Sequence, residues 1–281
     1  MDQNIYFAYD GSINSDWVAR YAVRLAGNIQ AEHLSLIHIR NGAVSDKQLD
    51  IKIAYIAALC SSHDIELKVS LLPKSPDVTA TLLQSIPAGG DTYCICGARA
   101  TSRGKGFLAG TISQKLLRAR RFNTLAIRVV NPGLLGCPAN VMFPLAGHPQ
   151  KFKAAMPFLL MFLPCLHKLT LLRIMTVHPL LFRYLSVVRS RAILQRGTRY
   201  VQETMAEIAR ETGNSTFTME DHVRISDDWV KEILILAGKV QTGLILLGAS
   251  DRFLESRFYF SSKIEQILRQ TPCDVGIYRK I

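Results

Sequence analysis

The feature that most constrains the fold is a regular alternation of apolar strands and helices. Short runs rich in β-branched and aromatic residues alternate with segments whose apolar residues recur at helical spacing. In the first half the expected strands are residues 4–9, 33–40, 66–72, 92–96 and 124–130, and the expected helices are 15–27, 45–62, 77–86 and 113–121. Strands separated by helices predict βαβ units, and therefore a parallel sheet.

A similar pattern starts again after the turn-forming run 131–133 (NPG), which predicts an internal duplication. The run 140–143 (NVMF) resembles the run 4–7 (NIYF), and Gly147 falls where Gly11 would. Further strands are expected at 169–177, 244–247 and 275–278, and helices at 154–166, 191–212 and 262–269. We therefore expect two tandem domains, residues 1–133 and 134–281.

Each domain is expected to be an α/β, Rossmann-like unit, with a five-stranded parallel sheet and helices on both faces. The terminal strands, from Thr124 to Val130 and from Val275 to Tyr278, are both short and apolar. We expect these two strands to make the contact between the repeats.

Composition excludes several classes of protein. With 48% hydrophobic residues and 20% charged residues, the chain is neither disordered nor collagen-like. Its most apolar stretch, residues 154–166, is shorter than the ~20 residues that span a bilayer, and Pro157 and Pro164 interrupt it.

We see no signal peptide, so we expect a cytoplasmic chain whose six cysteines stay reduced. Neither C-x-x-C nor H-E-x-x-H spacing occurs, so no metal site is expected.

The segment 97–113 (GARATSRGKGFLAGTIS) carries the main functional signal. It follows a strand, runs through a loop rich in glycine and arginine, and ends with Gly110 and Thr111 at the start of a helix. Free N–H groups at a helix start bind anions, and small residues let the backbone approach a phosphate. Asp10 also follows a strand, where it could accept hydrogen bonds from ribose. Together these segments predict a nucleotide site.

These residues resemble the universal stress protein family, in its tandem two-repeat form. That family has an opening strand that ends in Asp-Gly-Ser and a motif of Gly-x-x-Gly, nine residues, then Gly-Ser or Gly-Thr. Here Gly97 matches the first glycine, Ala100 stands in place of the second, and Gly110 with Thr111 follows after nine intervening residues. The resemblance implies an adenine nucleotide alpha hydrolase-like fold in both halves.

The resemblance also implies roles for individual residues of the first repeat. Asp10 would contact ribose or adenine, Gly11 and Ser12 would shape that turn, and Ile39 would pack near adenine. The phosphates would be held by Gly97, Arg99, Ala100, Gly110, Thr111, Ile112 and Ser113.

The second repeat departs from the family pattern. Ala146 replaces Asp10, and Asp251 stands where Ala100 does, so its carboxylate would repel phosphates. We expect this repeat to have lost nucleotide binding.

Each candidate residue also has a purely structural interpretation. Asp10 would stabilise a turn, and Thr111 or Ser113 would cap a helix.

The sequence therefore leaves two functions open. One is a stress-response protein that binds ATP, ADP or AMP in repeat one as a regulatory ligand, with Mg²⁺ bridging the phosphates. The other is a nucleotide-independent scaffold built as an internal pseudo-dimer, and a homodimer is a further alternative.

Two other functions are disfavoured. No positioned base can be recognised, so we assign no catalytic residue and expect a slow ATPase at most. The net charge of +12 suits nucleic acid, but no recognition motif is present and no aromatic residues interleave with the basic run. We expect neither nucleic acid nor a membrane as a partner.

Overall fold

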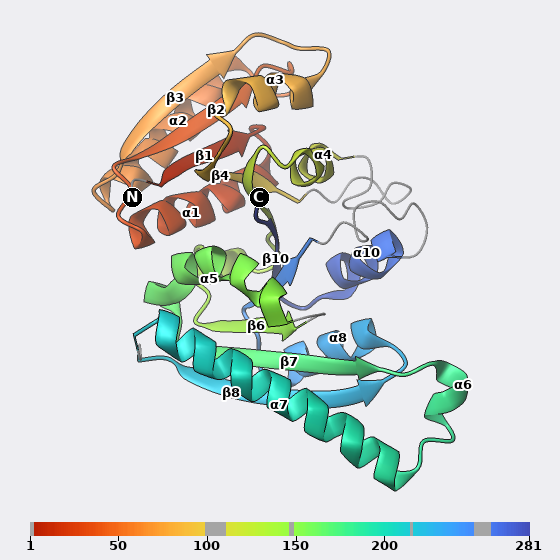
Figure 1. Cartoon of the computed structure of the whole chain (residues 1–281). Helices are drawn as coiled ribbons and strands as arrows, with labels where there is room; N and C mark the ends of the chain where they lie inside the picture. Colours follow the sequence, from red (N-terminus) through yellow and green to blue (C-terminus); the bar gives the residue numbers. More distant parts are fainter. Residues whose placement is uncertain (1–2, 99–110, 146–148, 214–215, 250–259) are drawn as a thin grey trace.

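The computed structural model describes residues 3–98, 111–145, 149–213, 216–249 and 260–281, and its strands form one ten-stranded sheet (Figure 1). Along the sheet the strands follow the order β3-β2-β1-β4-β5-β10-β9-β6-β7-β8. Their bounds are β1 Asn4–Tyr9, β2 His33–Ile39, β3 Glu66–Leu72, β4 Gly89–Gly97, β5 Phe122–Arg128, β6 Asn140–Leu145, β7 Lys168–Thr176, β8 Thr218–Ser226, β9 Leu244–Gly248 and β10 Asp274–Arg279.

The two halves of the sheet have the same topology. All pairs within β1–β5 and within β6–β10 are parallel, whereas β5 and β10 pair antiparallel, with Ala126 opposite Ile277. The expected pair of five-stranded parallel sheets is confirmed, as is the contact between the terminal strands. This pairing also removes two exposed sheet edges, which would otherwise offer unpaired N–H and C=O groups. The domain boundary expected at residue 134 lies in the β5–β6 connection, beside a 3₁₀ turn at Pro132–Leu134, and stays a prediction.

Helices cover both faces of the sheet, as expected (Figure 1). One face packs against α1 (Ile13–Asn28), α2 (Asp46–Ser61), α5 (Met156–Phe162) and α7 (Val187–Glu211). The other packs against α3 (Val78–Ser85), α4 (Ile112–Ala119), α8 (Trp229–Lys239) and α10 (Phe260–Gln270). The short helix α6 (Pro179–Phe182) buries none of its residues. No helix in the described ranges is long and apolar enough to cross a membrane, and the apolar stretch at 154–166 is largely buried.

Several elements begin earlier than their sequence patterns predict, because the capping residue lies upstream. The helix expected from residue 15 starts at Ile13 as α1, because Ser12 caps it, and the Ser12 Oγ accepts a hydrogen bond from the Ser15 N–H at 3.2 Å. Thr111 caps α4 in the same way, and α7 starts at Val187 after the cap Ser186. The strand β8 and the helix α8 were not expected from the sequence. For β8 the reason is that it carries charged residues and is an edge strand.

Asp274 joins the two halves at their shared strand pair. Its side chain is fully buried, and its Oδ2 accepts a hydrogen bond of 2.5 Å from the Tyr21 hydroxyl of α1. Its Oδ1 accepts from the N–H groups of Val130 at 2.7 Å and Asn131 at 2.8 Å. Burial raises the pKa of Asp274, although these hydrogen bonds and Arg128 act in the opposite direction. One carboxylate therefore holds β10, α1 and the connection that follows β5.

A disulfide corrects the expectation that all cysteines are reduced. Cys137 in the β5–β6 connection pairs with Cys165, which ends a 3₁₀ turn at Leu163–Cys165, with their Cα atoms 5.4 Å apart. The two residues are 28 positions apart, so their spacing alone did not indicate a pair. Cys94 and Cys96 are free and buried in the core.

Candidate ligand-binding pocket

A pocket of about 480 Å³ lies at the carboxyl ends of the central strands in the first half. Its walls come from the ends of β1, β2, β4 and β5, and from the starts of α1, α3 and α4. β1 lies between β2 and β4: the chain runs from β1 to β2 and β3 on one side, and then crosses to β4 on the other side. Ligands in open α/β sheets bind at such topological switch points.

Most of the residues singled out from the sequence are brought together here. Those that line the pocket are Asp10, Ser12, Ile39, Gly97, Thr111, Ile112 and Ser113. Gly11 lies in the turn beside it. Arg99, Ala100 and Gly110 lie outside the described residues.

The turn after β1 is held by its own side chains. Asp10 Oδ1 accepts a hydrogen bond from the Ser12 N–H at 2.9 Å, and Ser15 Oγ accepts from the Asp10 N–H at 3.3 Å. The structural interpretation of Asp10 is therefore observed, yet the same side chain also lines the pocket. Gly11 has a φ of +78°, a conformation that side chains disfavour.

Gly11→Ala tests how much the shape of this turn depends on glycine. A Cβ there would lie 2.8 Å from Val44 Cγ2, in addition to the strain of a positive φ. We expect the free energy of unfolding to fall by about 2–3 kcal/mol. The matched control is Gly42→Ala, because Gly42 also has a positive φ but has open space around its Cα. Urea unfolding would measure both, and equal losses would contradict the close packing at Gly11.

The starts of two helices face the pocket from opposite sides of the sheet. Ser12 caps α1, Thr111 caps α4, and both line the pocket. Thr111 Oγ1 accepts from the Gln114 N–H at 3.2 Å and lies 2.9 Å from the Ser113 hydroxyl. Helix N-termini carry partial positive charge, so the pocket suits an anionic group.

Arg128 is a pocket residue that the sequence pattern did not indicate. It is the last residue of β5, and Arg128 and Asp10 are the charged side chains of the described lining. Burial lowers the pKa of Arg128, while Asp274 opposes this shift. Arg128 lies near the carboxyl end of an expected strand, and this position is the feature of the sequence that could have indicated it as a pocket residue.

The apolar side of the pocket comes from β2 and α3. Ile37 and Ile39 at the end of β2 are nearly buried, and Val78 and Leu82 of α3 complete this wall. Among the described residues, no group of three or more His, Cys, Asp or Glu side chains could hold a metal ion.

The corresponding place in the second half is more crowded. Gly248 ends β9 as Gly97 ends β4, but the Tyr278 hydroxyl lies 2.9 Å from where a Cβ of Gly248 would be. At Gly97 the nearest atom is Val18 Cγ2, at 3.8 Å. Ala146, Gly147 and Asp251, on which the sequence prediction for this repeat depends, lie outside the described residues.

Solved structures with this fold include universal stress proteins. A universal stress protein from Archaeoglobus fulgidus DSM 4304 superposes with a TM-score of 0.61 at 15% identity, over 99% of this chain and 97% of that one. For a putative universal stress protein from Pseudomonas aeruginosa UCBPP-PA14 the TM-score is 0.59 at 14% identity, over 98% of this chain and 92% of that one. The cytoplasmic domain of a prokaryotic cation chloride cotransporter matches with a TM-score of 0.59 at 8% identity, over 100% and 96%.

The chain therefore has the fold of the universal stress proteins over essentially its whole length, as the sequence resemblance predicts. No protein-family model matches the sequence, and no curated protein does.

Proposed function

We propose that the pocket binds an adenine nucleotide, ATP, ADP or AMP, as the regulatory ligand of a stress-response protein in the cytoplasm. The observation that carries this proposal is that one pocket contains an apolar wall, a carboxylate and two helix starts. Its volume is within the range of small-molecule sites, about 300–1,000 Å³.

Each part of the pocket suits one part of a nucleotide. Ile39 and Leu82 offer an apolar surface to adenine, and Asp10 can accept hydrogen bonds from ribose hydroxyls. Gly97, Thr111 and Ser113 lie where the start of α4 favours phosphates. Mg²⁺ would be held mainly by the phosphates and water, because it needs few protein ligands in nucleotide sites.

We propose one site per chain. Tyr278 occupies the space beside Gly248 that stays open beside Gly97, which supports the loss of binding in the second repeat.

Gly97 allows a test that blocks the pocket with little effect on the fold. A Cβ at Gly97 would make only an ordinary contact with Val18, so Gly97→Ala should fold and bind. The longer side chain of Gly97→Leu would fill the pocket and raise the Kd for ATP about tenfold to a hundredfold. Titration calorimetry would measure both variants and the stoichiometry. Unchanged binding by the leucine variant, or two equivalent sites, would contradict the assignment.

A nucleotide-independent scaffold is the second candidate. In its favour, Asp10 and Thr111 already accept hydrogen bonds within the chain. If no adenine nucleotide gives heat on titration into the wild-type protein, the scaffold is the better description.

A further inference from the structure

Residues 178–199, which we call the arm, project from the second half of the molecule. The arm comprises α6 and the first part of α7, and Figure 1 shows it extending beyond the ends of β7 and β8. The buried residues of α7 are Gly197, Val201, Thr204 and Ile208, all in its later part. The ten residues before Gly197 correspond to about 15 Å of helix, and none of them is buried.

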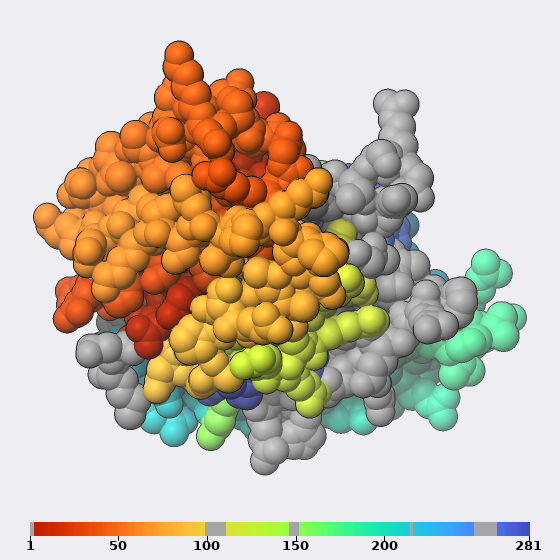
Figure 2. Space-filling model, turned by 90° about the horizontal axis from the view of Figure 1, so that it is seen from above, coloured from red at the N-terminus to blue at the C-terminus, as the bar shows by residue number. Residues whose placement is uncertain are grey.

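Gly197 marks the point where α7 meets the sheet. A Cβ there would lie 2.5 Å from Val223 Cγ1 and 3.3 Å from Met175 Cγ. The helix therefore packs tightly against β7 and β8 at this residue. Before Gly197 the side chains of α7 are exposed or only partly covered. Figure 2 shows the region around α6, in green, standing out from the surface.

The arm exposes an unusual amount of apolar surface. Leu180 is 70% exposed, Leu181 61%, Tyr184 85%, Val187 67% and Val188 78%. Single exposed apolar residues are common on proteins, but contiguous ones mark surfaces that contact a partner or a membrane.

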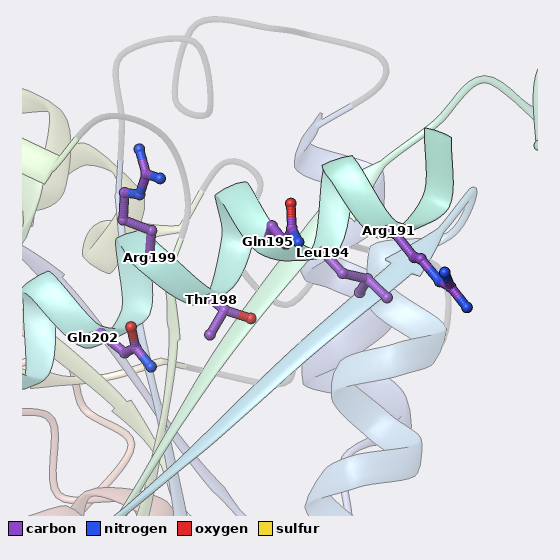
Figure 3. Close-up of a pocket in the computed structure, with 6 residues that line it drawn as sticks. All are labelled: Arg191, Leu194, Gln195, Thr198, Arg199 and Gln202. Carbon is purple, nitrogen blue, oxygen red and sulfur yellow. The ribbon is translucent and has the colours of Figure 1, made fainter. Parts of the chain in front are cut away.

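The arm is also strongly basic. Its arginines are exposed, and they are Arg183, Arg189, Arg191, Arg196 and Arg199. The whole sequence between Asp91 and Glu203 contains no acidic residue, so no carboxylate within the arm offsets these charges. Arg191 and Arg199 lie with Leu194 on an open part of the surface along α7 (Figure 3).

We propose that the arm attaches this protein to a membrane surface that contains anionic lipids. Basic amphipathic segments lie in the interface, with apolar side chains at the boundary of the acyl chains and cations at the headgroups. Arginine binds phosphate through paired N–H groups, and its apolar stem can lie along lipid. The attachment needs no spanning helix, and it differs from the sequence-based expectation that the chain has no membrane partner.

The charge of the arm and its exposed apolar residues together favour an anionic membrane surface over other partners. A second copy of the chain, paired arm to arm, would bring like charges together. A soluble anion would account for the arginines but would leave the apolar residues exposed. The proposal does not depend on nucleotide binding, because the pocket belongs to the other half of the chain.

Sedimentation of the full chain with lipid vesicles tests the proposal. We expect binding to phosphatidylcholine vesicles that contain about one third phosphatidylserine, and little binding to phosphatidylcholine alone. The triple variant Arg183→Gln, Arg189→Gln, Arg191→Gln should weaken binding about a hundredfold, at roughly fivefold per charge. Leu180→Ser with Leu181→Ser should also weaken it, since less apolar surface would enter the interface.

The matched control removes the same charge from exposed sites outside the arm: Lys47→Gln, Lys74→Gln and Lys239→Gln. It should bind the vesicles within about twofold of the wild type, because these charges lie away from the arm. All variants should keep the thermal midpoint, since none removes a buried side chain.

Three outcomes would overturn the proposal. Equal loss in the lysine control would show that overall charge, not the arm, attracts the lipid. A wild-type dimer that the arm variants dissociate would assign the surface to a second copy. Retention on an RNA homopolymer without binding to vesicles would assign it to nucleic acid.

Discussion

Asp274→Ala should lower the free energy of unfolding by about 3–5 kcal/mol, because it removes the acceptor for three buried donors. These donors are the Tyr21 hydroxyl and the N–H groups of Val130 and Asn131. Without the carboxylate they would stay buried and unpaired at the joint between the two halves. For a chain of this size, the thermal midpoint should fall by about 6–15 °C, measured by calorimetry.

Two variants act as controls for this prediction. Tyr21→Phe removes a single donor, so it should lower the free energy of unfolding by only about 1 kcal/mol. Asp274→Asn keeps an oxygen that can accept from the two N–H groups. Its loss in the free energy of unfolding should therefore lie between the losses of Asp274→Ala and Tyr21→Phe. If Asp274→Ala lowers the free energy of unfolding by no more than Tyr21→Phe does, the three-donor arrangement is not the source of stability.

The same carboxylate predicts a pH dependence of known sign. Burial raises the pKa of Asp274, so the folded chain holds this proton more tightly than the unfolded chain does. The stabilisation is complete below the ordinary pKa of aspartate and is lost as the pH rises through the raised value. Relative to Asp274→Asn, which does not titrate, the wild type should lose stability over that window and then level off. An advantage that grows with pH would contradict the direction of the shift.

ATP should raise the thermal midpoint of the wild type while phosphate release stays near background. Binding at a hundredfold excess over Kd stabilises the folded state by about 2.7 kcal/mol. The pocket offers helix starts and hydroxyls to phosphates, and the carboxylate of its described lining, Asp10, is assigned here to ribose. A dye-based melt and a phosphate assay on the same samples would measure both quantities.

Asp10 variants separate its two roles in this experiment. Asp10→Ala removes the acceptor of the Ser12 N–H, so its midpoint without ligand should fall, and its ATP-induced shift should vanish if Asp10 holds ribose. Asp10→Asn keeps one oxygen for the turn and should retain part of the shift. A full shift in the alanine variant would leave Asp10 with only its role in the turn. Turnover of ~1 s⁻¹ or faster would instead indicate an enzyme.

Much of the fold follows from local patterns along the chain. The runs 4–9 and 66–72 form strands with the expected bounds, because period-two patterns and turn residues act over a few neighbours. The gathering of Asp10 with Thr111 could also be predicted, since parallel strands end at one edge of a sheet. The matching terminal strands predicted the joint between the halves, which the β5–β10 pair confirms.

The features that were missed depend on contacts between distant segments. Arg128 lines the pocket because β5 places its end beside β4, and Cys137 meets Cys165 because the connection packs against the second half. Strand pairing places Ile127 beside Gly97 and Tyr278 beside Gly248, and only the tyrosine occupies the space beside its glycine.

The sequence alone determined the class of fold, the duplication and seven of the residues around the pocket, because periodicity, capping and turn chemistry are local. Which pocket stays open, which carboxylate is buried and which helix extends beyond the sheet were set by packing. Burial and open space are properties of all neighbours together. Asp274 looks ordinary in the sequence, and its importance follows from Tyr21, 253 residues away.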